Sequence, residues 1–315
     1  MISDKEKNFV SLVVYVRNSE NCIEKFLEIV DRELEKNFEK YEIICVNDAS
    51  DDESVNVIGK YAANRRNGVI SVINMSYFQG VETSMNAGVD LAIGDFVFEF
   101  DTIYVDNALC DMLMEAYRHA LKGYDIVSVV PDKNRNRLSS LFYKLYNMVS
   151  HTKNKLCTET FCILSRRGIN RICSINKNIP YRKPIYANCG LPVDYLVYKT
   201  SEKEGLKPAG NTDEERIDTA VNSLILFTDV AYRVSVWFAI TMMLGAALGG
   251  LYVISVHFSH RKPIEGWTTT MMFLTLCFCA VFALLAIIIK YLSIILKMIF
   301  QKQKYLIDSI SKYGN

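Results

Sequence analysis

Two aspartates follow apolar runs that are typical of buried strands. Asp48 comes shortly after Tyr41–Val46, and Asp101 closes the run 95–101. Amphipathic segments with helical spacing alternate with these runs, which predicts a parallel sheet with crossover helices. Ligands of such sheets bind at the carboxyl ends of the strands. We therefore expect both aspartates on the ligand-binding edge, where a carboxylate can accept hydrogen bonds or bind a hard cation.

The elements that would position these carboxylates occupy the first hundred residues. Strands are expected at 9–16, 41–46, 69–73 and 95–101, and helices between them at 20–36, 53–64 and 80–92. Farther along, residues 138–149 have the spacing of an amphipathic helix, and residues 156–164 resemble a strand. The predicted fold class is α/β with a mostly parallel sheet, in a domain that spans residues 1–215.

Two later segments, 234–258 and 268–289, are nearly free of charge. Each is long enough to cross a hydrocarbon layer of ~30 Å as a helix, so we expect two membrane spans. The remaining parts are an interfacial amphipathic helix at 216–233, a short outside loop at 259–267 and a basic tail at 290–315. The positive-inside rule places the tail, and with it the N-terminal domain, in the cytoplasm.

Positive charge is concentrated in one stretch of the chain. The protein has 315 residues and a net charge of +1, yet residues 131–183 hold 12 Lys and Arg against 2 Asp and Glu. Residues 1–130 hold 12 against 23. A basic stretch between an acidic domain and a membrane anchor indicates an anionic partner, and lipid phosphates fit better than nucleic acid. The alternative is a solvated basic surface.

Several short motifs occur in a fixed order along the chain. They are Tyr15–Glu20 (YVRNSE), Val46–Ser50 (VNDAS), Gly80–Asp90 with Gly94 and Asp95, Phe142–Asn147 (FYKLYN), and the lysine- and tyrosine-bearing exit 290–305. With the paired anchor, this order resembles the family 2 glycosyltransferases, which have a GT-A fold. It is most similar to their polyisoprenyl-phosphate branch, which includes dolichyl-phosphate mannose synthase and bacterial undecaprenyl-phosphate glycosyltransferases.

The resemblance implies an inverting sugar transfer from a nucleotide-diphosphate sugar to a polyisoprenyl (undecaprenyl) phosphate or a related lipid-linked acceptor. The reaction would serve cell-envelope glycan synthesis on the cytoplasmic face of the plasma membrane, by a multi-pass protein that is able to associate through its spans. The implied donor-binding residues are Tyr15, Asn18, Glu20, Asp48, Ser50 and Gly80. The acceptor phosphate is expected to meet Arg135, Arg137, Lys144 and Arg166. Taken alone, Asp48 is better explained as a cap of the turn that follows it, together with Ser50.

The metal motif departs from the family pattern. The resemblance makes Asp101 the catalytic residue, holding Mg²⁺ or Mn²⁺ on the donor diphosphate, but the next family acid is replaced by Ile103. Glu99 lies on the same side of the strand as Asp101 and is one candidate helper; Asp106 is another. The alternative for Glu99 is a solvent-facing position at a sheet edge. In the acceptor half, Thr160 and Cys162 replace a family acid and arginine.

Two hypotheses follow from the residues and the resemblance. The first is an active membrane glycosyltransferase. The second, motivated by the reduced metal motif, is a catalytically degenerate relative that binds a nucleotide sugar or a partner protein as a scaffold.

Overall fold

The computed structural model describes most of the N-terminal part of the chain and selected parts of the rest. The described residues are 5–65, 68–103, 105, 108–132, 143–144, 147–148, 155–175, 181–199, 237–238, 240–241, 244–245, 248, 266–300 and 305–314. The chain divides into two compact units, Met1–Asp218 with Lys302–Asn315, and Thr219–Gln301.

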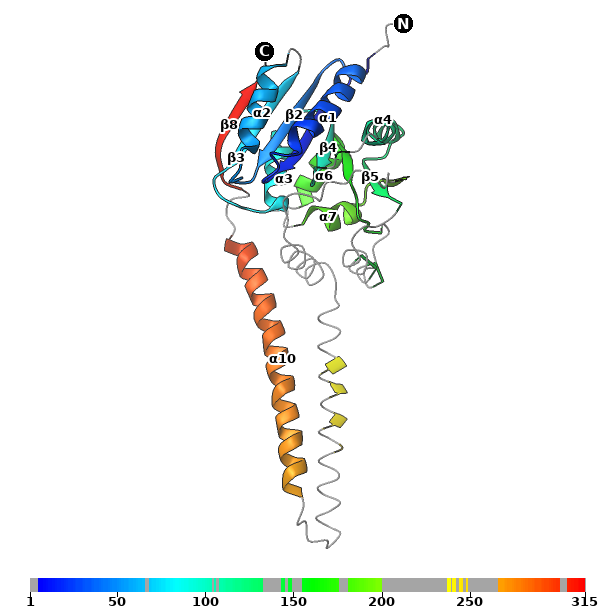
Figure 1. Cartoon of the computed structure of the whole chain (residues 1–315). Helices are drawn as coiled ribbons and strands as arrows, with labels where there is room; N and C mark the ends of the chain where they lie inside the picture. Colours follow the sequence, from blue (N-terminus) through cyan, green and yellow to red (C-terminus); the bar gives the residue numbers. More distant parts are fainter. Residues whose placement is uncertain are drawn as a thin grey trace. The chain divides into compact units, whose positions relative to one another are not determined.

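An eight-stranded mixed sheet forms the centre of the first unit (Figure 1), in the order β7-β5-β6-β4-β1-β2-β3-β8. Its strands are β1 (Val10–Val16), β2 (Tyr41–Asn47), β3 (Val69–Met75), β4 (Phe96–Phe100), β5 (Ile126–Pro131), β6 (Phe161–Ser165), β7 (Val193–Tyr198) and β8 (Ile307–Tyr313). The four central strands run parallel, whereas β6 is antiparallel to β4 and β5, and β8 is antiparallel to β3. The predicted mostly parallel α/β sheet is therefore confirmed.

The helices of the first unit cover both faces of this sheet. They are α1 (Ile23–Asn37), α2 (Ser54–Ala63), α3 (Val81–Leu91), α4 (Ala108–Leu121), α6 (Arg166–Ile175) and α7 (Arg182–Asn188). Every residue of β1 is buried, because Leu12 and Val14 join the core with α1, α2 and α4 while Val13 faces α3. Strands buried on both faces explain the continuous apolar runs of the sequence.

Helix α3 lies close to the sheet because it carries a glycine at the contact. A Cβ placed on Gly88 would be 2.4 Å from Val13 Cγ1 and 2.7 Å from Val46 Cγ2. The absence of a side chain at this one position therefore allows α3 to approach β1 and β2. This packing fixes the start of α3 beside the carboxyl end of β2.

The segment 290–315, predicted as a basic tail, contains regular secondary structure. Helix α10 (Gly266–Phe300) includes residues 290–300 of this segment. Strand β8 then pairs with β3 along the edge of the sheet, with Ile310 opposite Ile73. The apolar residues of β8 occur at every third position, not every second, so the strand period is absent from the sequence.

In the second unit, α10 is 35 residues long and contains the predicted segment 268–289. Its large apolar side chains are exposed; examples are Phe273, Phe278, Phe282, Leu285 and Ile288. Where the structure describes side chains, no helix has enough length and apolar character to cross a membrane, so the two predicted spans are not found there. The predicted interfacial helix lies outside the described residues, and 234–258 is described only at the positions given above.

Candidate active site

The predicted donor-binding residues come together at the carboxyl ends of β1 and β2. Asp48 is fully buried, and its carboxylate accepts a hydrogen bond from the Tyr15 hydroxyl at 3.0 Å. The backbone N–H groups of Gln79 and Gly80 donate to the same carboxylate at 2.8 and 2.9 Å. Asp48 thus ties the loop before α3 to the end of β2. A bound base would have to share a carboxylate that already has three protein donors.

The loops after β1 and β2 are joined by further hydrogen bonds from predicted residues. Asn18 N–H donates to Ser50 Oγ at 3.1 Å, and Glu53 N–H donates to Glu20 Oε2 at 3.1 Å. Asn18 has a φ of 47°, and Gly80 has a φ of 85° with open space where a Cβ would stand. The left-handed backbone at Gly80 favours glycine and lets its N–H face Asp48. The structure therefore groups all six predicted donor residues, while their contact with a nucleotide stays a prediction.

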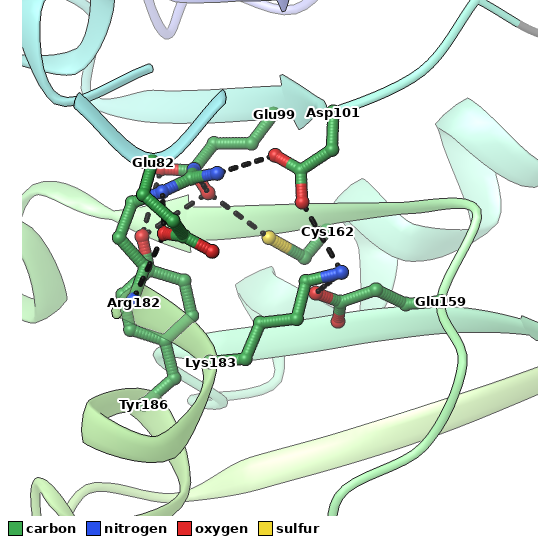
Figure 2. Close-up of polar contacts among 8 residues, drawn as sticks. All are labelled: Glu82, Glu99, Asp101, Glu159, Cys162, Arg182, Lys183 and Tyr186. Atoms are coloured by element: carbon green, nitrogen blue, oxygen red, sulfur yellow. Dashed lines mark hydrogen bonds and ion pairs between the residues drawn. The ribbon is translucent and has the colours of Figure 1, made fainter. Parts of the chain in front are cut away.

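A buried charge cluster lies at the end of β4 (Figure 2). Its centre is Arg182 at the start of α7, with a side chain that is 2% exposed. The guanidinium donates to Glu82 from α3 at 3.0 Å, to Glu99 from β4 at 2.8 Å, and to Asp101. Arg182 N–H also donates to Glu82 at 3.0 Å. One arginine thereby holds carboxylates from α3 and β4, which lie 100 and 83 positions before it in the sequence.

Glu99 is buried in the interior of the sheet, because β4 lies between β1 and β6. The solvent-facing alternative is therefore wrong. Beside Arg182, the Tyr186 hydroxyl donates to Glu99 at 3.0 Å and the Cys162 thiol donates at 3.4 Å. Burial raises the pKa of Glu99 to about 7, although the charge of Arg182 opposes the rise. Every described partner of Glu99 is thus a hydrogen-bond donor of the protein.

Asp101 and Lys183 form the exposed side of the cluster, with side chains 21% and 23% exposed. The Lys183 ammonium lies 3.1 Å from Asp101 Oδ2 and 3.3 Å from Glu159 Oε1, while Arg182 takes Asp101 Oδ1. Burial alone would raise the pKa of Asp101, but Arg182 and Lys183 hold it well below its ordinary value. Asp101 is therefore an ionised carboxylate with a cation on each oxygen.

This arrangement does not fit the divalent ion that the family resemblance implies. Ile103, which replaces the second family acid, is 2% exposed and belongs to the core. An ion at ~2.1 Å from Asp101 Oδ2 would lie within about 5 Å of the Lys183 ammonium, and their repulsion is roughly 6 kcal/mol at an effective dielectric constant of ~20. Within the described part of the chain, there is no group of three or more His, Cys, Asp or Glu side chains suited to a metal. Asp106 lies outside the described residues.

Of the four predicted acceptor residues, the structure describes Arg166 and Lys144. Arg166 donates to the carbonyls of Ala92 and Gly94, so it lies beside the start of β4, at the opposite end of the strand from Asp101. The contact of Arg166 with the acceptor phosphate stays a prediction. Lys144 is exposed, and its neighbour Tyr143 is subject to the charges of Lys183 and Glu159. The other two predicted acceptor residues, Arg135 and Arg137, are outside the described residues.

Sequence reasoning missed the two cations of the cluster. Arg182 and Lys183 stand in the stretch Tyr181–Pro184, which shows neither strand nor helix spacing. The available signal was Glu99, an acid inside an apolar strand, because a buried carboxylate requires donors or a cation. The sequence indicated that a partner exists without showing which of the basic residues supplies it.

A match to a known protein family agrees with the arrangement of the sheet. Residues 11–173 match glycosyl transferase family 2, which is more than half of the chain. The chain belongs to glycosyl transferase family 2. This family 2 protein is 27% identical over 197 residues to an uncharacterised glycosyltransferase of Synechocystis, and the match spans 60% of each chain. It is 23% identical over 274 residues to the bactoprenol glucosyl transferase of Shigella phage SfV, covering 84% of this chain and 86% of that protein.

Among solved structures, the family 2 protein resembles glucosyl-3-phosphoglycerate synthase from Mycobacterium tuberculosis in complex with Mn²⁺, UDP and its product. The TM-score is 0.51 at 12% identity, over 69% of this chain and 77% of that one. At this identity the likeness concerns the fold alone, and it agrees with the GT-A arrangement of the sheet.

Proposed function

We propose that this family 2 protein transfers one sugar from a nucleotide-diphosphate sugar to a polyisoprenyl phosphate, such as undecaprenyl phosphate, in cell-envelope glycan synthesis. The observation that carries the proposal is that the candidate site residues share one edge of the sheet. Asp48 with its five predicted companions, and the exposed Asp101–Lys183 pair, all follow the carboxyl ends of parallel strands or contact them. In such sheets this edge binds the ligand.

The name of the phage relative supports the acceptor class, since that protein is a bactoprenol glucosyl transferase. A second relative, from Pectobacterium atrosepticum, is an undecaprenyl-phosphate 4-deoxy-4-formamido-L-arabinose transferase, 29% identical over 167 residues, about half of each chain. A phosphate acceptor is already ionised near neutral pH, so it attacks without a strong general base. This suits a site in which Thr160 stands where the family has an acid.

The reaction needs no proton transfer in its central step. An oxygen of the acceptor phosphate attacks the anomeric carbon and forms the new C–O bond. The bond from that carbon to the donor's β-phosphate oxygen breaks, and its electron pair remains on the leaving nucleoside diphosphate. Attack from the opposite side inverts the anomeric configuration. The protein has to hold the two phosphates in line and stabilise the charge on the leaving group.

Attachment to a membrane is part of the proposal. The exposed apolar side chains of α10 and the charge-free segment 234–258 support it. The chain leaves the first unit after Asp218 and re-enters it at Lys302, and β8 then completes the sheet. If the intervening part inserts into a bilayer, an even number of crossings returns it to the side of the first unit. Two crossings with a cytoplasmic first unit meet this requirement.

The second candidate function is a scaffold that binds a nucleotide sugar or a partner without transferring sugar. The saturated carboxylate of Asp48 and the cations on Asp101 favour it. The test incubates membranes that contain the full-length protein with undecaprenyl phosphate and radiolabelled UDP- and GDP-sugars, in EDTA, Mg²⁺ or Mn²⁺. A labelled lipid product supports transfer. Nucleotide binding without any labelled lipid, across all donors and ions, would support the scaffold instead.

A further inference from the structure

We propose that Lys183 binds the donor's diphosphate in the place where the family has a divalent ion, and that Arg182 positions it through Asp101. Donor binding by this protein is then independent of divalent metal. The inference rests on the proposed function for the identity of the ligand, and it deepens that function by assigning the phosphate contact to the protein's own cations. Its starting point is the disagreement between the family's metal and the contacts of Asp101.

The burial of the two cations separates their roles. Arg182 is 2% exposed and is surrounded by Glu82, Glu99 and Asp101, so a substrate cannot reach it without dismantling the cluster. Lys183 is 23% exposed and lies beside the partly exposed carboxylate of Asp101. An ammonium has three N–H donors, and Asp101 and Glu159 take two of them. Lys183 therefore faces the sheet edge as a point charge suited to a phosphate oxygen.

Asp101 is a positioning residue in this arrangement. Its Oδ1 accepts from Arg182 and its Oδ2 from Lys183, so the carboxylate links the buried cation to the exposed one. Figure 2 shows Lys183 extended between Asp101 and Glu159. A lysine held from two sides loses little side-chain freedom on binding, which favours phosphate capture over that of a free surface lysine.

The basic stretch of the sequence that contains Lys183 favours an anionic ligand. Four carboxylates face two cations, but Glu99 has Tyr186 and Cys162 as additional donors. Both cations belong to the stretch 131–183, which holds 12 Lys and Arg against 2 Asp and Glu in the sequence. When the diphosphate binds, one of its oxygens joins Asp101 and Glu159 at the Lys183 ammonium or replaces one of them. Asp101 keeps its bond to Arg182 in either case. During transfer, Lys183 then stabilises the negative charge on the leaving β-phosphate oxygen.

The test measures binding of UDP, GDP, UMP and GMP to the full-length protein in detergent, by isothermal titration calorimetry. Wild type is compared in EDTA and in excess Mg²⁺ or Mn²⁺. We expect the better diphosphate to bind within about twofold equally in all three buffers. Lys183→Met should weaken that diphosphate about tenfold or more, because a charge-assisted hydrogen bond is lost, and should change the monophosphate little. Lys183→Arg should retain most of the affinity, and Lys60→Met, on exposed α2 surface, is the matched control.

Each alternative result has a defined meaning. A tightening of tenfold or more by Mg²⁺ or Mn²⁺ in wild type overturns the inference while leaving the proposed function in place, and this comparison needs no variant to fold. Unchanged diphosphate affinity in folded Lys183→Met also overturns it, as does equal weakening of mono- and diphosphate. Failure of wild type to bind any nucleotide, in any buffer, overturns the proposed function together with the inference.

Discussion

Replacing Arg182 with methionine should destabilise the first unit strongly and in a pH-dependent way. Methionine has an unbranched apolar side chain and no charge, so the change leaves the carboxylates of Glu82, Glu99 and Asp101 without their shared cation. Removing one partner of a buried ion pair costs about 3–5 kcal/mol. The Arg182–Glu99 pair alone, at a charge separation of ~4 Å and an effective dielectric constant of ~20, accounts for roughly 4 kcal/mol.

The pH dependence follows from Glu99, whose pKa is raised by burial to about 7 from an ordinary value of 4.5. Between these two pH values the folded protein keeps a proton that the unfolded chain releases. Glu99 therefore contributes stability at low pH, and this contribution is lost as the pH rises through about 7. When Glu99 is protonated, the loss of Arg182 leaves one fewer buried carboxylate without a cation than when Glu99 is ionised. The cost of Arg182→Met should thus be smaller near pH ~5.5 than near pH ~8.5.

The assay is native-state hydrogen exchange of the full-length protein, with peptides from β1 and β4 analysed by mass spectrometry and corrected for intrinsic rates at each pH. Glu99→Gln and the double variant complete a double-mutant cycle, and the coupling between the two positions should exceed about 1 kcal/mol. A destabilisation below about 1 kcal/mol at high pH, or an equal cost at both pH values, would refute the reasoning.

Three further predictions use the same exchange measurement or the binding assay. Glu99→Gln should remove most of the fall in stability between pH 4.5 and about 7, because the group that titrates there is gone; an unchanged slope contradicts the assignment. Ile103→Asp should lower stability by several kcal/mol and create no metal dependence, because this side chain belongs to the core; tighter donor binding with Mn²⁺ would contradict it. Gln79→Ala should speed exchange in residues 76–80 by about tenfold, because its amide donates to Leu306 O at 2.6 Å and accepts from Leu306 N at 2.9 Å; an unchanged rate would mean that β8 does not hold this loop.

The first half of the sheet could be predicted from the sequence because its strands are buried on both faces. Val10–Val16 and Tyr41–Asn47 are mostly apolar for this reason, and the helix between them has one clear apolar face. Strand β7, at one end of the strand order, lacked such a signal. For β7, only one of six residues is buried, so its pairing with β5 depends on neighbours that are distant in the sequence.

The candidate site was predictable where it is local and unpredictable where it is not. Asn18, Ser50 and Asp48 lie in loops that leave neighbouring parallel strands, so their meeting follows from the strand order. The contacts of Arg182 with Glu82 and Glu99 join residues 100 and 83 positions apart. Such pairing depends on how α7 packs on the sheet. Helix and strand periodicities concern residues a few positions apart and cannot predict it.

A buried cluster of this kind needs an explanation beyond stability. Ion pairs in the interior cost desolvation energy that their attraction only partly offsets, and apolar residues of similar volume often serve a fold as well or better. Glu99 is the only polar residue of the central strand β4, so an apolar side chain would be in keeping with the rest of the strand. Within the cluster, exposure rises from Arg182, which is 2% exposed, to Lys183, which is 23% exposed and contacts Asp101 after the carboxyl end of β4. Local departures from the rules of folding concentrate at functional sites. A buried Arg182 that orients the partly exposed Lys183 through Asp101 would present one cation to the ligand, as proposed above. This role gives a physical reason for a charged interior where the family resemblance implies a metal.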